Sequence, residues 1–404
     1  MSEIRAAFAR EILDSRGDPA LEVEVELESG VVGRASVPSE GGGAALRELR
    51  DGDRKRCRGR GLLRAIDAVC DKISPELEGR DPADQLDIDR LLTEMDGTPN
   101  CEKLGANVLL GVSLASARAA ADELGMPLYR ALGGPNAKVL PVPMIPMIEK
   151  AAPGGEDAPG CREVLIRPVG VRSFREAAEA AMEIRHRLRD ILAAAGSAPA
   201  TGERGSFVFS SGGGCSAAIE ALLKAVDLAG YRPGDEISLA IDFGGAAELP
   251  EKRLEYLERL LSLYPLDTLL GAADPGDRDG WRALAETLGD RCRIIGGARC
   301  APGTKGLADG IREGLANAVL IDPILCGTVT EVLDAVDLAR RAGCAAVLTR
   351  ALAETDDDAL ADLAVAGGAG EIAAGAIAAA GCIAKYSQLL RIEEELEDFA
   401  VYGV

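Results

Sequence analysis

The sequence predicts an α/β protein with two domains, an N-terminal α+β domain followed by a C-terminal αβ barrel. The chain has 404 residues, which is too long for a domain with one small hydrophobic core and suits two domains. An alternating strand pattern near the N-terminus leads into helical periodicity, and beyond residue 140 short apolar runs alternate with amphipathic helices. The expected domains cover residues 1–133 and 140–404, separated by the break GGPN at 133–136.

The N-terminal domain is predicted to open with a three-stranded antiparallel meander. Residues 21–28 alternate strictly, with apolar side chains on one face and glutamates on the other, which is typical of a half-buried strand. Residues 3–12 and 31–37 flank this strand, separated from it by turn signals. Helical patterns then follow at 60–73, 83–95 and 105–124.

Strands and helices alternate regularly in the C-terminal domain. Continuous apolar runs indicate strands buried on both faces, at 164–169, 237–241, 268–270, 293–295, 318–321, 345–348 and 371–374. Amphipathic patterns between them predict helices at 251–263, 280–288, 304–313, 329–342 and 357–366. Seven or eight such units fit a barrel better than an open sheet, and the active site of such a barrel lies where its strands end.

Composition excludes several classes of function. The formal net charge of −21 argues against nucleic acid and anionic membranes as partners, because both need basic surfaces. No apolar run is long enough to cross a bilayer, and the N-terminus has no secretory apolar region, so we expect a cytoplasmic protein. The single histidine, His186, leaves little scope for histidine-based catalysis or metal binding.

Ten cysteines are scattered along the chain without the two-residue spacing of zinc or redox motifs. Free and mostly buried thiols are the simplest interpretation in a reducing compartment. A metal or redox cluster remains an alternative, because four cysteines fall near the inferred mouth of the barrel: Cys161, Cys300, Cys326 and Cys382.

Several long segments closely resemble enolases. They include AREILDSRG (9–17), KLGANVLLGVSLA (103–115), PLYRALGGPNA (127–137) and AKYSQLLRIEEEL (384–396). The resemblance runs from end to end, so the chain is identified as a divergent member of the enolase family. This resemblance implies an enolase-like fold, with an N-terminal α+β domain, an eight-stranded TIM-like barrel and usually a homodimer.

The resemblance also implies a reaction. Enolases, or phosphopyruvate hydratases, are lyases of glycolysis that dehydrate 2-phosphoglycerate to phosphoenolpyruvate. A lysine removes the proton beside the carboxylate, and two Mg²⁺ ions stabilise the resulting enediolate. Three barrel carboxylates hold the first ion, because Mg²⁺ demands hard oxygen ligands.

Some family positions of this site are kept in the sequence. Asp242 matches the first metal-binding aspartate, Ser39 matches the serine that completes the second magnesium site, and Glu163 matches one member of the family's acid pair. The other two metal carboxylates are replaced by Ala273 and Gly297. We therefore expect Mg²⁺ to bind weakly or not at all.

The proton-transfer positions are lost as well. Asp322 stands where the resemblance places the catalytic lysine, and Ala373 stands where it places a second lysine. Arg204 occupies the position of the other glutamate of the family's acid pair. Arg350 occupies the first position of the family's His-Arg-Ser motif. Losing such groups together removes most of the stabilisation of the transition state.

Two classes of function compete. One is a catalytically inactive pseudoenzyme that keeps the scaffold for binding or assembly, with a true enolase or another protein as partner. The other is an enzyme, either a divergent lyase in which Asp322 joins Asp242 in a rewired carboxylate–magnesium site, or an active enolase. Asp242 and Glu163 can also be relics held by local hydrogen bonds.

Arginines gather near the predicted strand ends, at Arg162, Arg204, Arg299 and Arg350. Arginine suits bidentate binding of carboxylate or phosphate, so Arg204 and Arg350 are candidates for binding a small anion. The alternative is a set of solvated surface cations.

The resemblance places ion pairs across a dimer interface. Glu22 and Arg391 match one such pair. Arg10 matches a member of a second pair, but the glutamate that it would meet is Gly381 here. An exposed ion pair contributes at most about 1 kcal/mol, so we expect apolar burial to hold the dimer together despite this loss.

Overall fold

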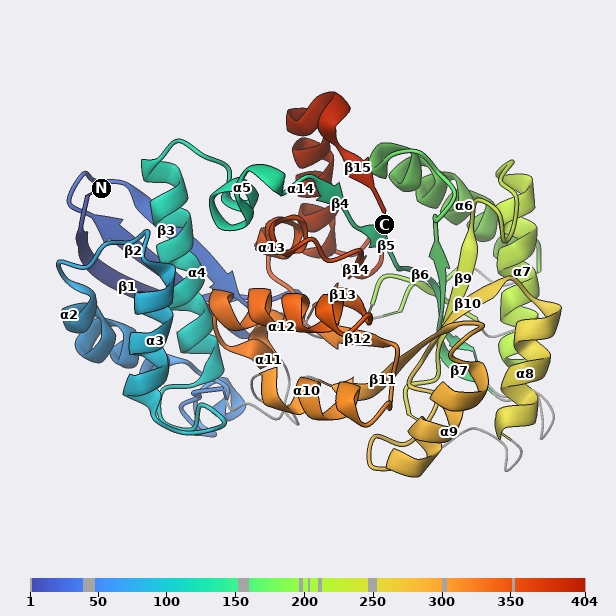
Figure 1. The fold of residues 1–404 in the computed structure, drawn as a ribbon, viewed down its shortest axis with the longest axis horizontal. Coiled ribbons are helices and arrows are strands. Elements are labelled where there is room, and N and C mark those ends of the chain that lie inside the picture. Colours follow the sequence, from blue (N-terminus) through green and yellow to red (C-terminus); the bar gives the residue numbers. More distant parts are fainter. Residues whose placement is uncertain are drawn as a thin grey trace.

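The computed structural model describes residues 2–38, 48–151, 160–195, 199–202, 204–209, 213–245, 253–299, 304–350 and 353–403. For residues 150, 151, 297–299, 304 and 305 it describes the backbone alone. Figure 1 shows the N-terminal strands and helices at one end of the molecule and the barrel strands, ringed by helices, at the other.

The N-terminal sheet is an antiparallel meander of β1 (Ile4–Leu13), β2 (Pro19–Leu27) and β3 (Val32–Val37). The alternation predicted for β2 is confirmed, because its apolar side chains are buried and its glutamates are partly exposed. Helix α4 (Ala106–Glu123) packs against β2 and β3. A Cβ atom at Gly33 would lie 2.1 Å from the carbonyl oxygen of Ala115, so glycine is needed for this close approach.

Two of the three helices predicted for the N-terminal domain are present as predicted. Besides α4, α3 spans Gln85–Asp96. The segment predicted as one helix at 60–73 is divided into α1 (Leu63–Asp67), a π-helical stretch and α2 (Ser74–Leu77). Pro75, inside α2, has no N–H to donate to the preceding turn, which interrupts a regular α-helical ladder.

The larger sheet has the order β5-β14-β13-β12-β11-β10-β9-β7-β6-β8. Its strands are β5 (Val142–Pro143), β6 (Ile145–Ala151), β7 (Cys161–Arg167), β8 (Phe207–Val208), β9 (Ser238–Asp242), β10 (Leu266–Leu270), β11 (Arg293–Arg299), β12 (Ala318–Ile321), β13 (Ala345–Thr349) and β14 (Glu371–Ala373). β5 pairs with β14 and β6 pairs with β7, and only Met144 separates β5 from β6, so the sheet closes on itself.

Closure gives eight strand positions within the described residues, if β5 and β6 count as one strand and the short β8 beside β6 is left out. β7 runs antiparallel to both of its neighbours, whereas β9 to β14 are parallel. The prediction of an eight-stranded barrel is confirmed. A small parallel pair, β4 (Val139–Leu140) and β15 (Val401–Tyr402), lies outside this sheet.

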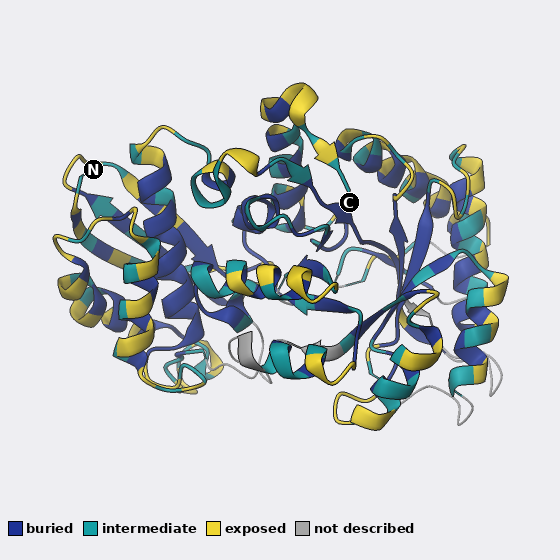
Figure 2. Ribbon diagram, viewed as in Figure 1, coloured by how far each residue is buried: buried dark blue, intermediate teal, exposed yellow. Residues whose placement is uncertain are grey.

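Helices surround the barrel, and its centre is filled by apolar side chains. The helices are α6 (Phe174–Ala194), α7 (Gly214–Leu228), α8 (Arg253–Leu263), α9 (Arg278–Leu288), α10 (Thr304–Arg312), α11 (Pro323–Cys326), α12 (Val329–Arg341), α13 (Ala359–Gly367) and α14 (Cys382–Leu396). Figure 2 shows the barrel strands mostly buried, and the helices buried on the face toward them. The interior layer includes Leu165, Ala240, Leu270, Ile295 and Val347.

The two halves are joined by buried polar contacts. Arg118 of α4 binds Asp357 through both terminal nitrogens, at 2.6 and 3.0 Å, and the backbone N–H of Ser36 donates to the same carboxylate at 2.8 Å. Helix α5 (Leu128–Gly133), which precedes the predicted domain boundary, packs against α13 of the barrel half. The contact crosses the predicted boundary, so a boundary near residues 133–140 stays a prediction. Among the described residues, no helix is long and apolar enough to span a membrane.

Candidate functional site

The C-terminal ends of the barrel strands surround a cavity of about 90 Å³. Asp242 at the end of β9, Arg350 directly after β13 and Ala373 at the end of β14 all line it, together with Arg162 and Glu163 of β7. A cavity of this size has room for a few water molecules or one small ion. We call this site the mouth.

Three buried carboxylates lie side by side on adjacent strands at the mouth. Glu149 of β6 is paired in register with Glu163 of β7, and Glu163 is paired with Asp242 of β9. Paired positions project to the same face of a sheet, and Leu165, two residues beyond Glu163, lies in the barrel interior. Sequence reasoning missed Glu149, although a glutamate that ends the apolar run PMIPMIE indicates a buried charge.

Arginines bind two of these carboxylates. Nη2 of Arg162 forms an ion pair with Oδ2 of Asp242, whose Oδ1 accepts the backbone N–H of Gly244 at 2.7 Å. Nη1 of Arg204 lies 3.2 Å from Oε1 of Glu163. The Arg204 and Arg350 side chains are 24% and 10% exposed, so they are not solvated surface cations.

The electrostatics of the mouth follow from this burial. Removal from water raises the pKa of Glu163, the charge of Asp242 raises it further, and Arg204 and Arg162 oppose the rise. Glu149 has no hydrogen-bond partner for either carboxylate oxygen among the described residues. Its carboxylate packs against Gly202, where an added Cβ would lie 1.4 Å from Oε1. The guanidinium groups are therefore the counter-cations of Asp242 and Glu163, whereas Glu149 binds neither of them.

Asp322 has a structural position. It follows β12 and caps α11, because its Oδ1 accepts the backbone N–H of Ile324 at 3.2 Å. It lines a second cavity, of about 60 Å³, that also includes Lys385 and Ile324. Among the described residues, the charged lining of the mouth includes Asp242 but not Asp322. Asp322 and Asp242 therefore line neighbouring cavities, which share Thr349 and Arg350.

Ala273, Ala373 and Gly297 have no side-chain group that can bind a ligand. Ala273 is 1% exposed, and Ala373 lines the mouth with a methyl group only. Gly297 lies within β11. Ser39 falls outside the described residues, and only the backbone of Arg299 is described.

The residues of the mouth do not fit Mg²⁺. Magnesium requires hard oxygen ligands in near-octahedral geometry, and both oxygens of Asp242 already bind N–H donors. Within the part of the chain that the structure describes, no three His, Cys, Asp or Glu residues are placed to hold a metal ion. Arginine nitrogens stand beside the carboxylates where a cation would bind.

The cysteines near the mouth do not gather into one cluster in the described chain. Cys161 contacts Cys215 of α7, and this hydrogen bond together with burial raises the pKa of the Cys161 thiol. Cys326 is a buried thiol at the end of α11, and Cys382 is a buried thiol at the start of α14. Cys300 lies outside the described residues.

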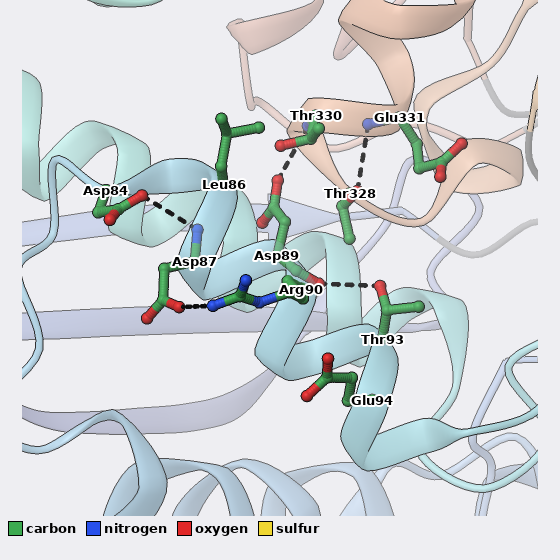
Figure 3. Close-up of a pocket in the computed structure, with 10 residues that line it drawn as sticks. All are labelled: Asp84, Leu86, Asp87, Asp89, Arg90, Thr93, Glu94, Thr328, Thr330 and Glu331. Carbon is green, nitrogen blue, oxygen red and sulfur yellow. Dashed lines mark hydrogen bonds and ion pairs between the residues drawn. The ribbon is translucent and has the colours of Figure 1, made fainter.

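A cavity of about 470 Å³ lies between α3 and α12, away from the mouth (Figure 3). Its three aspartates have local structural partners. Oδ2 of Asp89 accepts the backbone N–H of Thr330 at 2.9 Å, and Thr328 caps α12 by accepting the N–H of Glu331. Asp84 caps α3 in the same way. These contacts dock a barrel helix on the N-terminal half, so we assign this cavity to the interface.

The residues predicted at the dimer interface are on the surface. Arg10 forms ion pairs with Glu22 and Glu24 of its own chain, on the exposed face of the N-terminal sheet. Arg391 of α14 is exposed and lies 3.3 Å from Oε1 of Gln388. Arg10, whose expected glutamate is Gly381, therefore has partners within its own subunit.

Comparison with known families agrees with the fold. The model described as "Enolase, N-terminal domain" matches residues 4–132. The model described as "Enolase, C-terminal TIM barrel domain" matches residues 137–252 and 244–404. Together these matches cover nearly the whole chain, and they coincide with the meander and the closed barrel. The chain therefore belongs to the enolase family.

Proposed function

We propose that this enolase-family protein does not dehydrate 2-phosphoglycerate and instead acts as a binding or assembly scaffold whose mouth accepts a small anion. The observation that supports this most directly is the ion pair between Arg162 and Asp242. The side chain that matches the family's first metal ligand is bound to a guanidinium group. A cation beside Asp242 is thereby supplied by the chain itself.

The donors of the mouth suit an anionic ligand. Three arginines, Arg162, Arg204 and Arg350, line the cavity with two carboxylates, Glu163 and Asp242, and the third carboxylate, Glu149, lies beside Glu163 on the neighbouring strand. A guanidinium group has five N–H donors, so an arginine that pairs with one carboxylate oxygen keeps donors for a second anion. The cavity of about 90 Å³ suits sulfate, phosphate or a small carboxylate rather than a large metabolite.

Sulfate and phosphate are expected to raise the melting temperature of the protein. At ten times Kd, binding to the folded state adds about 1.4 kcal/mol, which corresponds to a shift of a few degrees. A thermal-shift titration with these anions measures it. Arg204→Gln should reduce the shift, whereas Arg189→Gln, on an exposed part of α6, should not. No shift with millimolar anion would contradict an anion site at the mouth.

An enzymatic function is the second candidate. Family membership and the retained Glu163 and Asp242 favour it, either as classical enolase activity or as a divergent lyase with a rewired carboxylate–magnesium site. The position of Asp322 as a helix cap argues against the rewired site. A direct assay for phosphoenolpyruvate separates classical activity from the scaffold.

We also propose a homodimer, on which a true enolase or another protein could assemble. Its support is the family resemblance together with apolar side chains exposed on β1, where Phe8 is 47% and Leu13 is 71% exposed. In the enolase family this meander packs on the barrel of a second subunit. Apolar burial of this kind holds interfaces together more effectively than the ion pair of Glu22 and Arg391.

Sedimentation at micromolar concentration should give twice the chain mass of 42.0 kDa. Leu13→Asp should shift the equilibrium toward the monomer, because a charge at the centre of an apolar interface must be desolvated. Leu263→Asp is the matched control, since Leu263 of α8 is 65% exposed. A wild-type monomer would show that the family-like segments serve the fold of a single subunit alone.

A further inference from the structure

A cavity of about 610 Å³ lies at the end of the barrel opposite the mouth. The first or second residues of four parallel strands line it: Asp267 of β10, Arg293 of β11, Ala345 of β13 and Glu371 of β14. Arg167, at the end of the antiparallel β7, also lines it. The volume lies within the range of small-molecule sites and is several times that of the mouth. We call this cavity the basal site.

A buried ion network forms the floor of the basal site. The Arg167 side chain is 1% exposed, forms an ion pair with Asp267 and lies 2.8 Å from Oε1 of Glu371. Nε of Arg293 lies 2.7 Å from the same oxygen. One carboxylate oxygen is thus shared by two guanidinium groups. Charges buried this deeply are retained only with close partners, which makes the floor rigid.

Two polar atoms of this floor have no partner among the described residues. They are Nε of Arg167, a donor, and Oε2 of Glu371, an acceptor, and both residues are more than nine-tenths buried. An unsatisfied buried group costs about 1–3 kcal/mol. Both atoms are shielded from solvent, so a ligand that carries an acceptor and a donor would reach them only if the Arg167 or Glu371 side chain turned toward the cavity.

The rim of the basal site is cationic. Arg293 meets Glu371 through Nε, so this contact uses none of its terminal N–H groups. Arg340 of α12 is exposed and donates from Nη1 to the carbonyl oxygen of Gly367 at 3.2 Å. With Arg167, three arginines line the site against two carboxylates, in a chain whose formal net charge is −21.

We propose that the basal site binds a small organic anion that carries a carboxylate or phosphate group and a hydroxyl group. The anionic group binds the terminal nitrogens of Arg293 and Arg340, whose planar geometry suits two-oxygen anions. The hydroxyl group donates to Oε2 of Glu371. The site is independent of the proposed anion binding at the mouth, because the two cavities share no residue.

Isothermal titration calorimetry with citrate and with inorganic phosphate tests the basal site. We expect citrate to bind the wild-type protein at about 10 mM or below, and Arg340→Gln and Arg293→Gln each to weaken binding about tenfold or more. Phosphate distinguishes a phosphate site from a carboxylate site. Tricarballylate, which is citrate without its hydroxyl group, should bind several-fold more weakly if Glu371 accepts that hydroxyl.

Arg189→Gln, on the exposed part of α6, is the matched control and should leave citrate binding unchanged. Arg340 is exposed, so its variant is expected to fold even if Arg293→Gln disturbs the Glu371 network. Citrate binding that persists in Arg340→Gln and Arg293→Gln, or that is lost only in Arg204→Gln, would overturn the basal site and leave the mouth proposal standing. Absence of citrate binding to the wild-type protein would also overturn it.

Discussion

Purified protein is expected to form no phosphoenolpyruvate from 2-phosphoglycerate above the buffer rate, even with excess Mg²⁺. Removal of one charge-stabilising group commonly costs about 10²–10³-fold in kcat. Here Ala273 and Gly297 replace two metal carboxylates, and Asp322 and Ala373 replace both lysines. Groups that act as a unit fail together, so no single retained residue rescues turnover. The ultraviolet absorbance of phosphoenolpyruvate measures the product directly.

Host enolase that co-purifies is the main source of error in this assay. Asp242→Ala provides the control, because a contaminant would be unaffected by it. A rate that is equal in wild-type protein and Asp242→Ala belongs to the contaminant. A rate that Asp242→Ala abolishes would establish the chain as an enzyme and contradict the scaffold proposal.

Reinstating the family residues is not expected to restore the reaction. The fourfold variant Ala273→Glu, Gly297→Asp, Asp322→Lys and Ala373→Lys would still have Arg162 bound to Asp242. Ala273 is buried, and Asp322 caps α11, so both changes also disturb packing. The same assay compares this variant with and without Arg162→Gln.

Lys385→Met is expected to lower the free energy of unfolding by about 3 kcal/mol, since it removes the nearer of the two cations of the buried Glu354 and leaves only Arg350, 4.0 Å from its carboxylate. The Lys385 and Glu354 side chains are both 4% exposed, and Nζ of Lys385 forms an ion pair with Oε2 of Glu354. The same nitrogen donates to the carbonyl oxygens of Thr355 at 3.1 Å and Gly381 at 2.9 Å. Methionine keeps the length of the side chain but provides none of these donors.

Urea unfolding measures this loss, and the double variant Lys385→Met with Glu354→Gln should recover part of it by removing the stranded charge. Lys224→Met is the matched control, because Lys224 is exposed on α7, and it should change stability by less than about 0.5 kcal/mol. If Lys385→Met lowers the free energy of unfolding no more than Lys224→Met does, the ion pair of Lys385 and Glu354 does not hold α14 to the loop that carries Glu354.

Much of the fold could be predicted from the sequence because burial repeats along the chain. Alternation in β2 identified the meander, and apolar runs between amphipathic helices identified the barrel. Short or irregular elements were missed for the same reason. β5 and β6, which close the barrel around Met144, contain two prolines and show no clear period.

The absence of carboxylates at Ala273 and Gly297, and of amines at Asp322 and Ala373, was determined by the sequence alone, since a residue without such a group cannot supply one in any fold. Only the tertiary structure decided which of the remaining charged groups meet. Arg162 and Asp242 are 80 positions apart, and Arg167 and Glu371 are 204 apart. Which charges meet depends on the register of neighbouring strands and on the closure of the barrel. Neither produces a periodic pattern in the sequence. The arginine-bound mouth and the basal site could therefore be identified only from the structure, in which the strands lie side by side.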